Sequence, residues 1–261
     1  RKAAHLASKY QKPFLHCHHL EAHCLVARLE EQLEFPYLAL LVSGGHCQLL
    51  WVQGVGDCSV VGGTLDDALG EAYDKAARML HLSSETGGGP ALERAALRGN
   101  ATSVNLPVPM KKRKDCDFSY AGLKNALRGR VAERRDERGL SDEEPLPEQD
   151  VVDLAASFQN VAIEHVEDRL KVAFKRVINE AGATPTLALV GGVAAPLGCG
   201  VSAVTPPPPP PPAAPPPLSL ATMSLCCCAI CARCRAISAL AASRSLSICA
   251  YATASACSAA C

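Results

Sequence analysis

The stretch EFPYLALLVSGGHCQLL, from Glu34 to Leu50, decides the fold of this 261-residue chain. Tyr37 to Val42 is a continuous apolar run, as expected of a strand buried on both faces of a sheet. The run meets Ser43-Gly44-Gly45-His46, and Cys47 to Gln53 alternates enough to be the returning strand. The stretch therefore predicts a β-hairpin. Glycines also let backbone N–H groups approach an anion, so phosphate binding at the turn stays open as a second interpretation.

A pair of histidines lies ahead of this hairpin. His19 and His23 fall in a segment whose apolar residues recur at helical spacing, namely Leu20, Leu25, Val26, Leu29 and Leu33. Residues four apart lie on one face of a helix, so both imidazoles can reach one transition metal. The alternative is that they are polar residues on a half-buried helix.

A zinc peptidase of the H-E-x-x-H type is the obvious competitor for this pair. In this chain the glutamate, Glu21, stands one place later than in that motif. At about 100° per residue, Glu21 points away from any metal that His19 and His23 hold. It therefore could not act as general base there, and the spacing disfavours a peptidase.

Glycines and carboxylates gather again from Gly62 to Ala76. Asp66 or Asp67 is predicted to cap a helix, and Asp74 lies on the face of that helix that carries Glu71. Such carboxylates are either solvated or hydrogen-bonded to sugar or amino-acid hydroxyls. Two further glycine turns follow, Gly87-Gly88-Gly89 before a short helix through Leu97, and Gly191-Gly192 after a buried strand at Thr186–Val190.

Basic residues cluster in the second half of the chain. Lys111–Lys114 is a short basic run, which is either a solvated loop or a contact for a nucleic-acid backbone. Arg128, Arg130, Arg134 and Arg135 could extend it. Residues 133–148 are charge-dense and predict an exposed linker. Residues 150–181 predict a long amphipathic helix with His165 in or near the core.

Six motifs together resemble a known family. They are HHLEAH (His18–His23), EFPYLALLVSGGHCQLL (Glu34–Leu50), TLDDALGEAYDKAARML (Thr64–Leu80), GGGPALE (Gly87–Glu93), CDFSYAGLKNAL (Cys116–Leu127) and LVGGVAA (Leu189–Ala195). In this order and with these gaps, the chain resembles the bacterial and organellar tRNA threonylcarbamoyladenosine transferases over about residues 10–195. The form DFSYAGLK is similar to the bacterial and mitochondrial branch of that family.

The resemblance implies a fold and a reaction. The fold is α/β, the two-lobe, ribonuclease H-like fold of actin, sugar kinases and the Hsp70 ATPase, expected here to be incomplete at both ends. The reaction transfers a threonylcarbamoyl group from threonylcarbamoyl-AMP to N6 of the adenosine just 3′ of the anticodon, in tRNAs that read codons beginning with A. The implied partners are tRNA, threonylcarbamoyl-AMP and either a second subunit or other proteins of the modification pathway, with no membrane.

The resemblance also implies site residues. His19 and His23 match the family's metal-binding histidines, so one divalent ion per subunit, iron or zinc, is expected. Such an ion can polarise a carbonyl or neutralise phosphate charge. No side chain is expected to be catalytic beyond this metal site. The implied substrate contacts are Leu41, Val42, Ser43, Gly44, Gly45, Asp74, Gly89 and, less closely matched, Glu93.

The chain departs from the family pattern after Ala195. Pro196 stands where the family has an asparagine that contacts substrate, and Pro lacks both an amide side chain and a backbone N–H. The family's third metal ligand is a later aspartate, whereas no acidic residue follows Pro196. We therefore expect weak metal binding and poor or absent transfer from the chain as written. The alternative function is that of an inactive relative with a binding or assembly role.

Composition divides the chain into three expected parts. Residues 1–36 are expected to be the remnant of an N-terminal lobe with the metal-binding helix, and residues 37–195 the second lobe. Residues 196–261 form a low-complexity tail of Pro, Ala, Ser and Cys, expected to be disordered and frameshifted or intron-derived.

Charge and cysteine usage limit the remaining possibilities. Lys and Arg number 26, as do Asp and Glu, and all the acidic residues precede Pro196. Scattered cysteines before Pro196 favour a reducing compartment over a disulfide framework. No stretch is apolar enough for a clean membrane span. We expect a mitochondrial or plastid location in a eukaryote and a cytoplasmic one otherwise. A sugar or acetate kinase of the same superfamily is disfavoured because those kinases lack the histidine pair.

Overall fold

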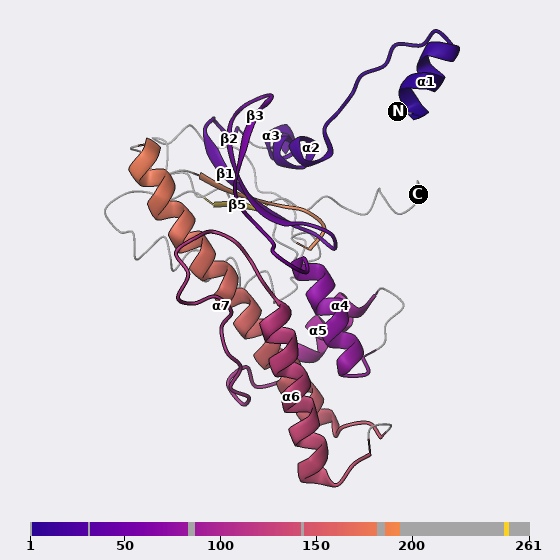
Figure 1. Cartoon of the computed structure of the whole chain (residues 1–261), viewed down its shortest axis with the longest axis vertical. Coiled ribbons are helices and arrows are strands. Elements are labelled where there is room, and N and C mark those ends of the chain that lie inside the picture. Colours follow the sequence, from indigo (N-terminus) through magenta and orange to yellow (C-terminus); the bar gives the residue numbers. More distant parts are fainter. Residues whose placement is uncertain are drawn as a thin grey trace, which may run out of the picture.

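A mixed sheet and a group of helices that extends below it form most of the molecule (Figure 1). The computed structural model describes residues 2–30, 32–82, 87–141, 144–181, 186–193 and 248–250. Within these residues the strand order is β3-β2-β1-β4-β5. No helix in these ranges is long and apolar enough to cross a membrane.

The sheet combines an antiparallel meander with parallel strands. The meander consists of β1 (Tyr37–Val42), β2 (Cys47–Gly54) and β3 (Asp57–Gly63). After a series of helices the chain returns as β4 (Thr186–Val190), parallel to β1, and β5 (Ile248–Ala250) lies parallel to β4. A meander that continues through helices into a strand parallel to β1 confirms the predicted α/β class and is the arrangement expected of an actin-like lobe.

The predicted hairpin is confirmed, and its first strand lies at the centre of the sheet. All six residues of β1 are buried. Because successive side chains alternate, Leu38, Leu40 and Val42 face one helical layer while Tyr37, Ala39 and Leu41 face the other. A strand buried on both faces needs no polar alternation, which explains its continuous apolar sequence.

Helices cover the two faces of the sheet unequally. The smaller layer is α2 (His19–Leu25) with α3 (Ala27–Glu30), which share a core with the sheet through Cys24 and Ala27. The larger layer is made of α4 (Leu69–Met79), α5 (Gly88–Ala96), α6 (Ala121–Arg138) and α7 (Glu148–Ala181). Helix α1 (Lys2–Lys9) buries no residue and lies apart in Figure 1.

The helix that carries the histidine pair is shorter than its spacing predicted. Helix α2 ends at Leu25, and after Val26 the chain restarts as the single turn α3. As a result Leu29 is 82% exposed, whereas Leu33 is buried beyond the end of α3.

The predicted linker at residues 133–148 is wrong in its first part. Helix α6 continues to Arg138 and ends at Gly139, whose φ of +66° is the left-handed conformation common after a helix. Arg135 is buried and donates to the carbonyls of Ser141 and Glu144, 2.6 Å from each. It therefore closes the end of α6 and is not available to nucleic acid.

The predicted capping of α4 is also wrong. Residue Ala68 occupies its cap position, and no side chain caps it. Asp66 instead accepts from the Tyr120 N–H at 2.8 Å and from the Ser119 hydroxyl at 2.5 Å, so it caps α6 from a distant part of the sequence. Asp67 binds lysines on both α4 and α6.

The long helix α7 confirms the periodicity of residues 150–181. Its apolar stripe packs on the larger helical layer, and His165 is fully buried within it, as predicted. The His165 ring lies edge-on to both Phe118 and Tyr120, and its Nε2 accepts from the Ser119 N–H at 3.2 Å. His165 therefore acts as a core residue.

Two domain predictions stay predictions. The predicted domain boundary at residue 36 does not coincide with a gap in the packing, since α2 and the sheet share a core. Of the tail at residues 196–261, only Ile248–Ala250 is described, and these three residues form β5 beside β4. The other tail residues lie outside the described ranges.

Candidate functional site

Two imidazoles come together on α2. His19 begins this helix and His23 follows one turn later, and their ring centroids lie 4.6 Å apart, edge to face. Burial lowers the pKa of His23, and the neighbouring His19 and His46 rings lower this pKa further. Since neutral imidazole is the form that binds metals, the surroundings favour the binding-competent state of His23.

A third imidazole reaches this pair from the hairpin turn. The ring centroid of His46 lies 5.6 Å from that of His19. Ser43 Oγ lies 3.4 Å from His46 Nδ1 and accepts the His46 backbone N–H at 2.9 Å, so the serine orients the ring. His46 had no predicted role, and its position inside the hairpin turn is the only signal for it in the sequence.

Glu21 points to the opposite end of the hairpin. Its Oε1 accepts the N–H of Gly56, in the β2–β3 turn, at 2.6 Å. The prediction that Glu21 faces away from the histidine pair is therefore confirmed, and no glutamate of α2 is positioned as the base of a metallopeptidase.

Helix α4 packs directly against the glycine turn between β1 and β2. A Cβ at Gly70 would meet Gly44 Cα at 2.9 Å and Ser43 O at 3.0 Å, so only glycine permits this approach. The corresponding Cβ positions of Gly44 and Gly45 have no atom within 4 Å, which leaves open space beside the turn. The first turn of α4, which has no side-chain cap, thus begins next to this open space.

Asp74 links α4 to the second glycine turn. It lies one turn beyond Gly70, is exposed, and its Oδ1 accepts the N–H of Gly89 at 2.6 Å. Gly88 packs so closely that a Cβ there would lie 3.0 Å from the same carboxylate oxygen. Asp74 and Gly89, predicted as site residues from distant motifs, are therefore neighbours.

The third glycine turn lies beside the end of β1. Gly191 has a φ of +108°, and a Cβ there would lie 2.3 Å from the Val42 carbonyl oxygen. That oxygen accepts the Val193 N–H at 3.1 Å. The tight contact brings the turn after β4 against the turn after β1, as parallel neighbouring strands require.

Other predicted contacts have less access to solvent. The side chains of Leu41 and Val42 are buried in the two cores of the sheet, so any contact with a substrate must come from their main chains. Glu93 is half-buried on α5, one turn beyond Gly89.

The predicted site residues form one continuous series of contacts. The series leads from His23 and His19 through His46 to Ser43, then through the glycine turn to α4, Asp74 and Gly89. Among the described residues, however, no group of three histidine, cysteine or acidic side chains is arranged to hold a metal ion. The described part of the site thus offers an imidazole pair, with donors from glycine turns close by.

Comparison with known proteins decides the family. A family model described as tRNA N6-adenosine threonylcarbamoyltransferase matches residues 1–203. The chain belongs to this family. The match extends beyond the predicted limits of residues 10 and 195, so the resemblance does not stop at Ala195.

Individual tRNA N6-adenosine threonylcarbamoyltransferases are identical to this chain at about half of the aligned residues. The protein of that name from Brucella anthropi is 47% identical over 192 residues, which are 73% of this chain and 50% of that protein. The one from Methylorubrum populi is 50% identical over 190 residues, which are 73% of this chain and 52% of that protein. The chain spans about half the length of the curated relatives it matches.

Membership in the tRNA N6-adenosine threonylcarbamoyltransferase family confirms the recognition made from the six motifs and the actin-like fold that it implied. The roles of the single site residues stay predictions.

Proposed function

We propose that this chain takes part in threonylcarbamoyl transfer from threonylcarbamoyl-AMP to N6 of the adenosine just 3′ of the anticodon in tRNAs that read codons beginning with A. The observation that carries this proposal is the continuous series of contacts from the α2 histidines to Asp74 and Gly89. It combines imidazoles, main-chain donors and a carboxylate, which suit a phosphate-activated acyl group and its amino-acid portion.

The imidazole pair fits a divalent metal ion. Ring centroids 4.6 Å apart on one helix face suit two nitrogen ligands of one ion, and burial lowers the pKa of His23, which favours its neutral form. His19 and His23 would hold the ion, iron or zinc, with the other coordination positions open to water or substrate oxygen. Such an ion supplies positive charge beside the carbonyl and phosphate oxygens.

The glycine turn would bind the phosphate of the adenylate. Gly44 and Gly45 leave open space beside their main chain, and the N-terminal end of α4 lies against the same turn. Main-chain N–H groups and a helix N-terminus both stabilise phosphate charge, which grows as AMP leaves. A mixed anhydride is already activated, so the departing AMP needs no acid from a side chain.

Asp74 would orient the rest of the substrate. Its Oδ1 accepts the Gly89 N–H, and this hydrogen bond holds the carboxylate beside the second glycine turn. A carboxylate fixed in this way can accept a hydrogen bond from a ribose or threonine hydroxyl, or from the adenosine amine as it attacks the carbonyl.

A transfer assay tests this proposal. The 261-residue chain would be incubated with threonylcarbamoyl-AMP, unmodified tRNA and zinc or iron, and the tRNA nucleosides quantified by mass spectrometry. Because Pro196 replaces the family's asparagine, we expect only a small amount of modified adenosine, lost in Asp74→Asn and unchanged in Asp136→Asn, which alters an exposed residue of α6. Adenylate binding without any modified adenosine would contradict transfer and favour the role of an inactive, binding relative.

A further inference from the structure

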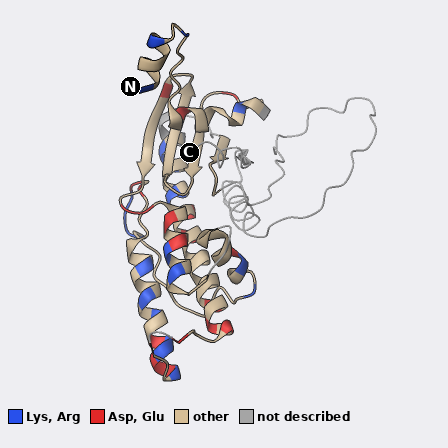
Figure 2. Ribbon diagram, turned by 90° about the vertical axis from the view of Figure 1, so that its right-hand side faces the viewer, with Lys and Arg blue, Asp and Glu red and all other residues tan. Residues whose placement is uncertain are grey.

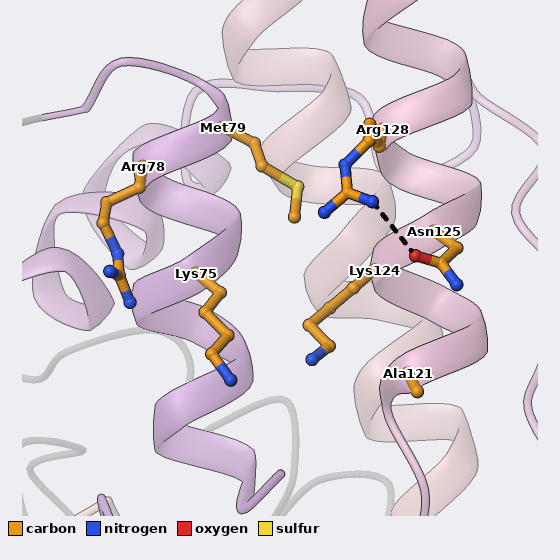
Figure 3. A pocket seen from close by; sticks show the side chains of 7 residues that line it. All are labelled: Lys75, Arg78, Met79, Ala121, Lys124, Asn125 and Arg128. Atoms are coloured by element: carbon orange, nitrogen blue, oxygen red, sulfur yellow. Dashed lines mark hydrogen bonds between the residues drawn. The ribbon is translucent and has the colours of Figure 1, made fainter. Parts of the chain in front are cut away.

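A groove between α4 and α6 gathers positive charge outside the site just described. It has a volume of about 410 Å³ and opens between the two helices (Figure 3). Its lining residues are Lys75, Arg78, Met79, Ala121, Lys124, Asn125 and Arg128. Four of these seven side chains are cationic, and none is aromatic. The α4–α6 groove therefore offers charge without a surface on which a base could stack.

Two of the cations are held in place by carboxylates. Asp67 binds both lysines, Lys75 at 2.8 Å and Lys124 by a shorter contact, and Glu71 also binds Lys75 at 2.8 Å. The shared carboxylate joins the two helices and fixes both ammonium groups in the gap that Figure 3 shows between them. Lys124 is only 14% exposed, so its position is firmly set.

The two arginines supply the excess charge. Arg78 and Arg128 are exposed, and neither forms a salt bridge within the described part of the chain. Arg78 Nε donates to the Asp74 carbonyl and Arg128 donates to the Asn125 side chain, both at 3.3 Å. Each guanidinium therefore keeps most of its donors for another ligand.

Several other basic residues form salt bridges with carboxylates. The partners are Glu133 for Arg130, Glu137 for Arg134, Asp150 for Arg138, Glu164 for Lys111 and Asp115 for Arg113. The run Lys111–Lys114, an obvious candidate from sequence, is thus partly neutralised. Basic and acidic residues alternate along the helices in the same way in Figure 2. Within the described residues the α4–α6 groove differs because it brings two arginines without a salt bridge together in one hollow.

The groove also lies close to the glycine turn. Gly70 of α4 touches that turn, and Arg78 follows eight residues later, or about 12 Å along the helix axis. Arg78 is bonded to the main chain of Asp74. A chain of phosphates that leaves the site along α4 would therefore reach Arg78 and Arg128 within a few nucleotides.

We infer that the α4–α6 groove binds the phosphodiester backbone of the RNA substrate beside the nucleotide that is modified. Guanidinium groups form paired hydrogen bonds with phosphate oxygens, and the excess charge of the groove comes from Arg78 and Arg128 because both lysines are paired with carboxylates. Without an aromatic side chain the groove makes contacts to phosphate that position the RNA without reading its bases. This inference rests on the proposed tRNA-modifying function.

The test compares two double variants that change the net charge equally. Arg78→Gln/Arg128→Gln removes the unpaired cations, and Arg130→Gln/Arg134→Gln removes paired ones from α6. The affinity of the 261-residue chain for unmodified tRNA would be measured by fluorescence anisotropy at several salt concentrations. We expect roughly tenfold weaker binding and a salt dependence reduced by about two counterions in the first variant only.

Three results would overturn the inference. The first is an equal loss of tRNA affinity in both variants. The second is displacement of tRNA by inorganic phosphate when its concentration equals that of the tRNA phosphates. The third is displacement of tRNA by polyglutamate when its concentration of negative charges equals that of the tRNA. The second would indicate a site for a free anion and the third an acidic protein partner. Transfer by the wild-type chain is a separate readout, so failure of the proposed function would appear there and not in the comparison of the two variants.

Discussion

At the scale of residues, the site depends on a few small or buried side chains. Sequence patterns predicted His19, His23 and the glycine turns, because their chemistry and spacing are local. His46 was missed, since its contact with His19 exists only after α2 packs beside the hairpin. Leu41 and Val42 matched a family motif, yet burial limits them to main-chain contacts.

Two glycines should respond oppositely to alanine. Gly191→Ala should lower the free energy of unfolding by roughly 2 kcal/mol or more, because alanine disfavours the observed φ of +108° and its Cβ would clash with the Val42 carbonyl. Gly129→Ala should raise it by roughly 0.5–1 kcal/mol, because Gly129 lies exposed inside α6 with open space around it. Urea unfolding measures both. Equal effects of the two substitutions would contradict the tight turn after β4.

Buried His165 should make stability depend on pH. Burial lowers the pKa of His165 from 6.5 to about 4, so the unfolded chain takes up a proton more readily. Its stabilising contribution is full above pH 6.5 and is lost as the pH falls toward 4, by on the order of 3 kcal/mol in total.

His165→Gln provides the comparison, because its amide oxygen can still accept the Ser119 N–H. Between pH 6.5 and about 4, the free energy of unfolding of the wild type should fall more steeply than that of the variant, as measured by urea titrations at several pH values. Identical slopes would show that His165 is protonated in the folded protein.

At the scale of elements, strands were more predictable than helix ends. The strands β1 and β4 follow from apolar runs that end in glycine turns, and β2 follows from its alternation after the first of these turns. The caps could not be predicted, because Asp66 stabilises the start of α6 from a position before α4.

Removing this distant cap should weaken α6. Asp66→Ala leaves the Tyr120 and Ser119 groups without their acceptor, so the free energy of unfolding should fall by roughly 1–2 kcal/mol. Hydrogen exchange should quicken in the first turn of α6. The exposed control Asp136→Ala should change stability by no more than about 0.5 kcal/mol. An equal loss in both variants would contradict capping by Asp66.

At the scale of the whole molecule, distant motifs converge on one sheet edge. The turns after β1 and β4 meet because these strands are parallel neighbours, and α4 reaches the first turn through Gly70. The motif order predicted this family and fold. The size of the helical layer of α6 and α7, the position of β5 and the groove beside α4 required coordinates, since they depend on packing between residues far apart in sequence.

Metal binding by the α2 histidines tests the central claim most directly. Co²⁺ would be titrated into the metal-free chain and followed by visible absorption, which distinguishes nitrogen ligands from the thiolates of the cysteine-rich tail. His19→Ala and His23→Ala would be compared with His5→Ala, an exposed residue of α1. We predict about one nitrogen-ligated equivalent in the wild type and in His5→Ala, with affinity lowered at least roughly 100-fold in each of the other variants. Unchanged nitrogen-ligated binding in His19→Ala and His23→Ala would contradict the account.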